Sequence, residues 1–249
     1  MKVFATSDFH GNLQGLEPSG FDLCIIGGDY SPRWRGVTIE DQVAWMQREF
    51  IPWMAQRSSV QFVVVPGNHD IVMRQSEMLA SSGWEFFGWP DNCKFLIDEG
   101  FEFGGLKIWG CPWIGPCGGR WAFEESSDVR LEARYDKIPS CLDILVCHNA
   151  PMWEWSGADA VMNTRKRCYE HSGSRALAKA IEKTMPRVVF CGHVHDGLHG
   201  DIWVDWKNGD GNRTYLYNVS RLDGKYQVRY EPRTIEILTR QQMTERDKR

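Results

Sequence analysis

The chain has 249 residues, of which 42% are hydrophobic, and its formal net charge is −4 with an isoelectric point near 6.0. This length and composition are enough to bury a full core as a single α/β domain. The lack of a basic excess argues against stable nucleic-acid binding and against electrostatic attachment to membranes. No apolar stretch approaches the roughly 18 residues that a membrane-spanning helix needs, and the N-terminus runs directly into a strand-like segment, unlike a signal peptide.

Short apolar runs rich in Val, Ile and Phe predict six early β-strands. These runs cover residues 2–6, 23–26, 62–65, 106–109, 144–146 and 188–190. Three later runs are expected to pair in a more antiparallel manner, namely residues 202–204, 214–218 and 234–238.

Two amphipathic segments between these strands predict α-helices. Thr38 is placed to cap a helix over residues 39–56, in which Pro52 is expected to produce a kink. The apolar face of this helix consists of Val43, Met46, Phe50 and Met54. A second helix is expected to begin near Ser174 and to end before Pro186.

The alternation of strands and helices predicts a layered α/β fold with right-handed crossovers. Residues 111–168 lack a clear pattern apart from the strand at 144–146, so we expect them to be largely loop. Residues 1–238 are expected to form one domain, and residues 239–249 a charged C-terminal tail that frays.

The eight cysteines contain no C-x-x-C pair, and several of them lie in or at the end of apolar runs, as Cys24, Cys147 and Cys191 do. A reduced cysteine in such a place behaves as a small hydrophobic residue. This pattern favours a reducing, cytoplasmic location over a disulfide-linked fold.

Five of the predicted strands are followed, within two or three residues, by side chains that commonly bind metals. In chain order these segments read Asp8-Phe9-His10, Gly28-Asp29, Gly67-Asn68-His69-Asp70, His148-Asn149 and Gly192-His193-Val194-His195. Because the carboxyl ends of parallel strands share one edge of an open α/β sheet, these loops would bring their side chains to one crevice. Five of the seven histidines lie in these segments, which ordinary turn chemistry does not explain.

The predicted ligands are imidazoles, carboxylates and an amide, with no thiolate required. Such a set favours Mn²⁺, Fe, Zn²⁺, Ni²⁺ or Co²⁺ over a structural zinc site, and Mn²⁺ is our first choice. Seven ligands exceed the four of one tetrahedral zinc, so two metal ions that share a carboxylate are the simplest interpretation. Two ions about 3.5–4 Å apart lower the pKa of a bridging water and bind a phosphate during in-line attack. The residues therefore predict hydrolysis of a phosphoester.

The five segments follow the pattern D-x-H, G-D, G-N-H-[DE], H and G-H-x-H between residues 8 and 195. In this order and over this span, the chain resembles the calcineurin-like metallophosphoesterase superfamily. Residues 7–13, SDFHGNL, also resemble a frequent opening of that family. The resemblance implies a four-layer αββα sandwich of mixed sheets, a dinuclear metal site at the carboxyl edge of the strands, and a small phosphoester as substrate.

The resemblance also implies a role for each matching residue. One metal would be held by Asp8, His10, Asp29 and His195. The other would be held by Asp29, Asn68, His148 and His193, so that Asp29 bridges the two ions. Asn68 and His69 would contact the substrate, and His69 would protonate the leaving oxygen instead of binding a metal.

One segment departs from the protein serine/threonine phosphatases of this superfamily. Residues 28–34, GDYSPRW, resemble their G-D-Y-V-D-R-G block, but Pro32 stands where they have the aspartate that orients the catalytic histidine. His69 is therefore expected to depend on Asp70 or on a backbone group. Arg33 is a candidate for substrate binding because a planar guanidinium pairs well with phosphate, and a solvated loop arginine is the competing interpretation.

Three further segments resemble a small phosphodiesterase branch related to the brain-expressed metallophosphoesterase-domain proteins. They are IWGCPW at residues 108–113, RWAF at 120–123 and LVCHNAP at 145–151. Tryptophans in and near these segments are expected to overhang the metals, where they either stack a base or cover a loop-rich end of the domain. They are Trp109, Trp113, Trp121, Trp153 and Trp155. A basic run at residues 165–167 either attracts phosphate or is a solvated face.

The leading hypothesis is a phosphodiesterase on small diesters such as cyclic nucleotides, acting by attack of a metal-bridging hydroxide. The first alternative is a phosphomonoesterase, including a protein serine/threonine phosphatase. A nuclease would need basic DNA-binding parts that we do not find in the sequence. A non-catalytic scaffold is disfavoured because no expected metal ligand is missing. The sequence makes no prediction of oligomeric state.

Overall fold

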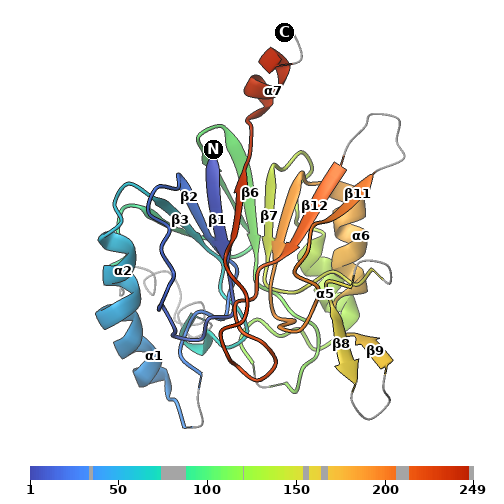
Figure 1. Ribbon diagram of the computed structural model, residues 1–249. Helices are drawn as coiled ribbons and strands as arrows, with labels where there is room; N and C mark the ends of the chain where they lie inside the picture. Colours follow the sequence, from blue (N-terminus) through green and yellow to red (C-terminus); the bar gives the residue numbers. More distant parts are fainter. Residues whose placement is uncertain are drawn as a thin grey trace.

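A computed structural model describes residues 1–33, 36–73, 88–119, 121–153, 157–163, 168–205 and 213–246. Two mixed β-sheets pack face to face, and helices cover the outer face of each sheet (Figure 1). The expected four-layer αββα sandwich is therefore confirmed.

The first sheet has five strands in the order β13-β1-β2-β3-β4. Four of them are parallel: β1 (Lys2–Thr6), β2 (Leu23–Ile26), β3 (Gln61–Val64) and β4 (Cys93–Phe95). The fifth, β13 (Arg233–Glu236), pairs antiparallel with β1. Strands β1 to β3 are apolar on both faces because both faces are covered, which explains why they read as continuous apolar runs.

The second sheet has six strands in the order β11-β12-β10-β7-β6-β5. Its parallel centre consists of β6 (Leu106–Cys111), β7 (Ile144–Cys147), β10 (Val188–Cys191) and β12 (Arg213–Asn218). The edges are antiparallel and consist of β5 (Glu99–Phe103) and β11 (Ile202–Asp205). The antiparallel expectation for the late strands is correct for β11 and β13. It is wrong for the pairing of β12 with β10, which is parallel. The chain reverses direction in β11 and again in β12, so β12 runs in the same direction as β10.

The outer face of the first sheet is covered by the helix expected over residues 39–56. It consists of α1 (Ile39–Trp45), the π-helical turn η1 (Met46–Phe50) and α2 (Ile51–Ala55). The Thr38 side chain caps it by accepting a hydrogen bond from the Asp41 amide. The wide turn precedes Pro52, where the Ile51 N–H bonds to the Met46 carbonyl five residues back. A proline cannot donate the normal helical hydrogen bond, and the wide turn accommodates that loss.

The outer face of the second sheet is covered by α5 (Asp128–Tyr135) and α6 (Arg175–Thr184). Helix α6 begins as expected, with the Ser174 hydroxyl accepting a hydrogen bond from the Leu177 amide. The expectation that residues 111–168 are largely loop is confirmed for the described residues, but it missed α5 and a hairpin of β8 (Ala160–Asn163) and β9 (Cys168–His171). Helix α5 has eight residues and leaves Val129 75% exposed, so it shows too little apolar periodicity to be recognised.

The C-terminal segment forms a helix, α7 (Arg240–Arg246), which projects away from the two sheets (Figure 1). None of the helices formed by the described residues combines the length and the apolar character that crossing a bilayer requires. The seven cysteines whose side chains are described are all free.

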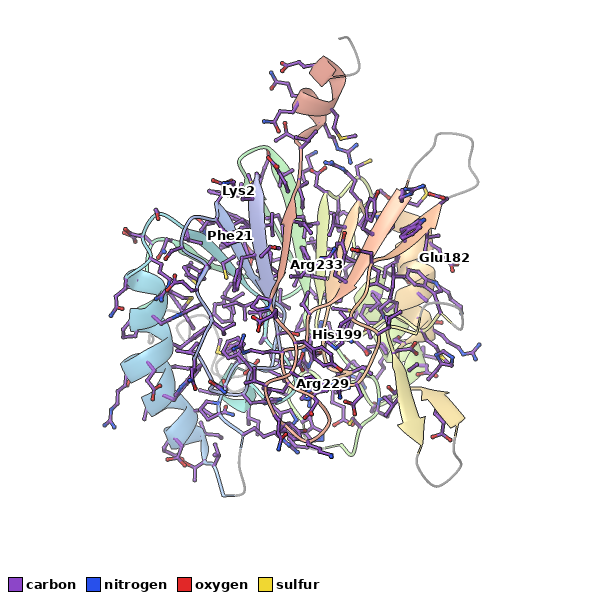
Figure 2. The ribbon with its side chains drawn as sticks, viewed as in Figure 1. Lys2, Phe21, Glu182, His199, Arg229 and Arg233 are labelled. Atoms are coloured by element: carbon purple, nitrogen blue, oxygen red, sulfur yellow. The ribbon has the colours of Figure 1, made fainter. Side chains whose placement is uncertain are left out.

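Side chains fill the space between the two sheets (Figure 2). This inner cluster includes Val3, Ala5, Leu23, Ile25 and Val63 from the first sheet, and Ile108, Ile144, Val146, Val188 and Phe190 from the second. The alternate residues of the same strands pack with the buried faces of the helices. The core therefore fixes the register of the strands in both sheets, and so the positions of their carboxyl ends relative to one another.

Replacing Ile25, which is fully buried between the sheets, by alanine should lower the free energy of unfolding by about 2–5 kcal/mol. Urea denaturation followed by far-UV circular dichroism measures this change. Val129→Ala on α5 is the control and should change the stability by less than about 0.5 kcal/mol. If both substitutions had equally small effects, the placement of Ile25 in the core would be wrong.

Candidate metal centre

The predicted site residues all lie on loops that follow the carboxyl ends of strands, and these loops share the lower edge of the sandwich in Figure 1. Among the described residues, two groups of three side chains place metal-binding atoms within 4.8 Å of one another. The first group is Asp8, His10 and His195, and the second is Asp29, His148 and His193. The six side chains come from the loops after β1, β2, β7 and β10, so the fold assembles them from distant parts of the sequence.

Asp29 belongs to the second group and also lies beside the first. Its Oδ2 atom is 3.9 Å from His10 Nε2 of the first group, and its Oδ1 atom is 3.4 Å from His148 Nε2 of the second. The carboxylate therefore presents one oxygen to each group, which is the position that a bridging ligand occupies.

Four of these six residues have a left-handed backbone. The φ angles are 51° for Asp8, 43° for His10, 51° for Asp29 and 66° for His193. This conformation is unfavourable for residues other than glycine and persists only where the surrounding structure imposes it. The turns after β1, β2 and β10 are therefore strained at the residues that carry the candidate ligands.

Backbone carbonyls fix the orientation of two of the imidazoles. His148 donates its Nδ1 hydrogen to the Gly27 carbonyl at 2.9 Å, and His195 donates its Nδ1 hydrogen to the Asp223 carbonyl at 3.1 Å. The Nε2 atom of His148 then faces Asp29 Oδ1 at 3.4 Å and donates a hydrogen bond to Asn68 Oδ1 at 2.9 Å. The Nε2 atom of His195 faces Asp8 Oδ1 at 3.3 Å. This arrangement is typical of histidines that bind metals.

The other two imidazoles are kept neutral. Burial lowers the pKa of His10 to about 4, and burial together with His148 lowers the pKa of His193 to about 4. Both ring nitrogens of His10 are buried without a hydrogen-bond partner among the described residues. Such atoms are rare in native proteins unless a ligand satisfies them. A neutral imidazole with an available lone pair is what a metal ion requires, so His10 fits a metal site.

The two carboxylates are ionised despite their burial. Burial alone would raise their pKa values, but His195 beside Asp8 and His148 beside Asp29 hold both well below the ordinary range. In return, although burial opposes its protonation, the charge of Asp29 raises the pKa of His148 to about 9. Metal binding at such a site displaces the imidazole protons.

Further groups that the sequence did not reveal hold Asp8 in place. Its Oδ2 atom accepts hydrogen bonds from the hydroxyls of Ser7 and Ser220 and from the His193 amide at 3.0 Å. Ser7 follows β1 and Ser220 follows β12, so the bonds join the loops of both sheets. Serines near strand ends are too common for their sequence positions to indicate this role.

Asp70 holds the loops after β2 and β3 together. Its carboxylate accepts hydrogen bonds from the amides of Asp29 at 2.9 Å, Ser31 at 2.8 Å and Gly67 at 2.7 Å. Burial, followed by the negative charge of Asp29, raises the pKa of Asp70 to about 7. Asp70 thus positions Asp29 through the backbone.

Backbone bonds also position His69. The His69 amide donates to Asp29 Oδ1 at 2.7 Å, and the Gln42 side chain donates to the His69 carbonyl at 2.7 Å. Both bonds hold the main chain of His69 and not its ring, so the expectation that Asp70 or a backbone group orients the ring stays a prediction. Gln42 comes from α1, outside every motif, which is why the sequence did not identify it.

His69 faces a cavity of about 320 Å³ that also contacts Asp29, Asn68, His193 and His195. The His69 side chain is 3.9 Å from Asp29 at its closest, from Nε2 to Oδ2. Burial lowers the pKa of His69, and the positive charge of Arg33 lowers it further. His69 belongs to neither three-residue group, which leaves its ring nitrogens available to a substrate.

Arg33 is exposed and lines this cavity, with its guanidinium 4.1 Å from the centre of the Tyr226 ring. Tyr226 in turn lies 5.3 Å from the His10 ring and 5.0 Å from the His195 ring. Tyr226 was not among the predicted site residues, because it lies outside the five ligand-bearing segments. No sequence signal marks it, because the parallel pairing of β12 with β10, which opens the following loop at the same edge, is seen only in the structure.

The tryptophans have divided roles. Trp121 lies over the site, with its ring 4.2 Å from the His69 ring. Trp113 and Trp153 are buried instead, and their indole nitrogens donate to Asp98 and Glu182. The expectation that these two overhang the metals is therefore wrong, because their indoles complete the core under the loops.

Two other sequence predictions lie outside the described residues, namely Trp155 and the basic run at residues 165–167. Trp109 is partly buried against the core. His199, labelled in Figure 2, donates a hydrogen bond to the His195 carbonyl at 3.0 Å and stacks on Tyr230. It supports the His195 loop without belonging to either group.

Comparison with known proteins agrees with this geometry. A family model described as calcineurin-like phosphoesterase matches residues 1–197. The human Metallophosphoesterase domain-containing protein 1 is 24% identical over 255 residues, which cover 96% of this chain and 71% of the human protein. A UPF0046 protein of Caenorhabditis elegans is 25% identical over 190 residues, covering 70% of this chain and 61% of its own length.

One solved crystal structure supports the fold. It superposes with a TM-score of 0.59 and 14% sequence identity, and the match covers 95% of this chain and 99% of the other. At that identity the likeness concerns the architecture of the two sheets and their helices.

Gly67 gives a direct test of how tightly the site is packed. A Cβ atom at Gly67 would collide with Asp29 Oδ1 and lie 2.6 Å from His148 Cε1. Gly67→Ala should therefore displace the second group and reduce bound metal to less than half that of the unaltered protein, as measured by elemental analysis after loading with Mn²⁺. Gly115→Ala is the matched control, because its Cβ atom would meet only Leu131 at an ordinary 3.6 Å. Full metal binding by Gly67→Ala would contradict the packing described above.

Proposed function

The chain belongs to the calcineurin-like phosphoesterase family and so to the metal-dependent phosphoesterases, and from this premise we propose that it hydrolyses small phosphodiesters such as cyclic nucleotides. The observation that carries the proposal is the meeting of the two candidate metal groups at Asp29, beside a histidine that belongs to neither group and faces a cavity.

In this proposal one ion is held by Asp8, His10, Asp29 and His195, and the other by Asp29, Asn68, His148 and His193. We propose Mn²⁺ as the first choice, with Fe, Zn²⁺, Ni²⁺ or Co²⁺ as alternatives, because the donors are nitrogen and oxygen atoms without a thiolate. When bound, two such ions supply the positive charge that activates a water and neutralises the phosphoryl oxygens.

His69 is proposed to donate a proton to the leaving oxygen. Its backbone is held on both sides by Asp29 and Gln42, so the ring has a fixed approach to the cavity. Proton donation by a positioned imidazole makes the departure of a poor leaving group easier. Asn68 and Arg33 are proposed to bind the phosphoryl oxygens from the same cavity.

The charge of the cavity supports a diester. Among the described residues that line the cavity, Arg33 is the only one with a permanently positive side chain. A phosphodiester carries a single negative charge, whereas a monoester carries close to two and would benefit from further cations. The aromatic rings of Tyr226 and Trp121 also flank the cavity and offer faces on which a base can stack.

A reducing compartment is also part of the proposal. The seven cysteines whose side chains are described are free, and four of them, Cys24, Cys111, Cys147 and Cys191, are buried near the strands of the core. This pattern supports a cytoplasmic location.

With added Mn²⁺, the protein should hydrolyse bis-p-nitrophenyl phosphate with a kcat/KM more than about tenfold above that for p-nitrophenyl phosphate, a difference of about 1.4 kcal/mol. Asp29→Ala should lower the diesterase kcat/KM by more than about a hundredfold, because a shared ligand matters more than the outer-shell groups that support ligands. Asp136→Ala, at the exposed end of α5, is the control. Faster hydrolysis of the monoester would refute the diester preference, and retained activity in Asp29→Ala would refute the site.

His69→Ala should slow the hydrolysis of diesters with alkyl leaving groups by about 10²–10⁴-fold, because those oxygens need a proton to leave. The same substitution should slow the release of p-nitrophenol by less than about tenfold, since p-nitrophenolate leaves unprotonated. Steady-state kinetics on both substrates measures the contrast. Equal losses on the two would show that His69 is not the proton donor.

A further inference from the structure

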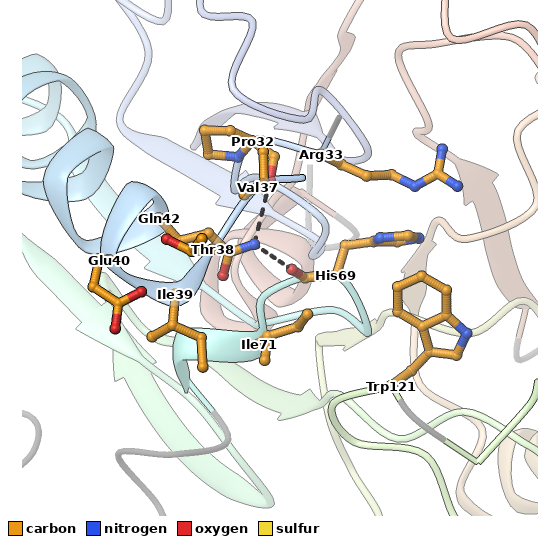
Figure 3. Close-up of a pocket in the computed structure, with 10 residues that line it drawn as sticks. All are labelled: Pro32, Arg33, Val37, Thr38, Ile39, Glu40, Gln42, His69, Ile71 and Trp121. Carbon is orange, nitrogen blue, oxygen red and sulfur yellow. Dashed lines mark hydrogen bonds between the residues drawn. The ribbon is translucent and has the colours of Figure 1, made fainter. Parts of the chain in front are cut away.

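A second and larger cavity lies beside the one that contacts the metal groups. Its volume is about 690 Å³, and it is bounded by the Pro32 turn, the start of α1, Ile71 and Trp121 (Figure 3). Arg33, His69 and Trp121 line both cavities, so these three side chains form the boundary between them. In Figure 3 the three lie one above another, with His69 between Arg33 and Trp121.

The larger cavity is mainly apolar. Its walls include the side chains of Pro32, Val37, Ile39 and Ile71 and the indole of Trp121. A drug-sized organic group commonly binds in an apolar cavity of a few hundred Å³. We refer to this cavity, as lined by these five residues, as the apolar chamber.

The polar side chains of the chamber wall are engaged in the fold. The Thr38 hydroxyl accepts the Asp41 amide as the cap of α1. The Gln42 side chain donates to the His69 and Pro32 carbonyls and accepts from the Val72 amide. Because these hydrogen bonds lie within the protein, neither side chain is placed to replace the hydrogen bonds that a polar ligand makes with water.

One charged side chain in the wall disfavours an anion. Glu40 is exposed and lines the chamber, and its backbone amide, followed by Thr38, lowers the pKa of its carboxyl. The nearest positive charge in the wall, Arg33, lies at the boundary with the metal groups. A phosphoryl group is therefore favoured on the metal side of His69, and an uncharged group on the chamber side.

We propose that the apolar chamber binds the uncharged aryl or branched alkyl group of the leaving alcohol, and so determines which diesters the protein cleaves. This inference rests on the proposed function. A water oxygen bonds to phosphorus, and the P–O bond to the alcohol breaks with its electron pair on the alcohol oxygen. His69 gives its proton to that oxygen, the attacking water releases one proton to the solvent, and the solvent then reprotonates His69.

The position of His69 between the two cavities explains why the leaving alcohol, and not the group that stays on phosphorus, enters the apolar chamber. An ester oxygen within reach of the His69 ring has phosphorus on one side, toward Asp29 and Asn68. The carbon of the alcohol then points to the other side, where Val37, Ile39 and Ile71 lie. The group that stays on phosphorus remains in the smaller cavity with Tyr226.

Isothermal titration calorimetry of the Mn²⁺-loaded protein tests the proposal with phosphonates, whose P–C bond is not hydrolysed. Phenylphosphonate should bind at least about tenfold more tightly than methylphosphonate, because the chamber removes the ring from water. Val37→Glu should abolish this advantage and leave methylphosphonate binding unchanged. Val129→Glu introduces the same change on exposed α5 and should keep the advantage.

A second variant tests the charge of the wall without disturbing a buried residue. The unaltered protein should bind 4-carboxyphenylphosphonate more weakly than phenylphosphonate, because Glu40 repels the added carboxylate. Glu40→Lys should reverse this order.

The outcomes separate the chamber from the proposed function. If neither phosphonate bound the Mn²⁺-loaded protein, both the proposed function and the chamber would be overturned. If the two phosphonates bound equally well, or if Val37→Glu kept the advantage of the phenyl group, the chamber alone would be overturned. An unchanged order of binding in Glu40→Lys would likewise count against the chamber alone.

Discussion

Two buried carboxylates, Asp8 and Asp29, are the constraint on which the rest of the site depends. A carboxylate withdrawn from water is stable only when its charge is compensated. Here His195 compensates the charge of Asp8, and His148 compensates that of Asp29. Asp8 also accepts hydrogen bonds from serine hydroxyls, and both carboxylates accept hydrogen bonds from backbone amides. The same imidazoles and carboxylates are the donors that divalent metals prefer. The groups that make burial possible are thus also the groups that would bind the ions.

This compensation requires a rigid scaffold, which the two-sheet core provides. The loops carry left-handed residues at Asp8, His10, Asp29 and His193, a conformation that isolated turns would not keep. Each strained turn directly follows a strand that is buried on both faces, so the strain is opposed by the packing of the strands. Asp70 adds a second restraint by joining the loops after β2 and β3. The packing of the core therefore keeps these turns in a strained backbone conformation that they would otherwise leave.

Much of this could be predicted from the sequence, for reasons that are specific to the residues. The central strands are covered on both sides, so they read as uninterrupted apolar runs, and the ligands follow them at fixed short distances. Helix α5 and the β8–β9 hairpin escaped recognition because they are short, and α5 buries only Leu131 and Tyr135. Gln42 and Tyr226 escaped because their contacts depend on how α1 and the loop after β12 fold back over the site. Motifs identify the ligands, whereas the side chains that position or flank the ligands come from elsewhere.

We propose that Asp29 joins two metal ions at the carboxyl edge of the sandwich. Anomalous X-ray scattering from crystals soaked in Mn²⁺ tests it most directly. We predict two anomalous peaks about 3.5–4 Å apart, one beside Asp8 and one beside His148, with the Asp29 carboxylate between them. A single peak, or peaks that do not contact Asp29, would show that Asp29 does not bridge two ions.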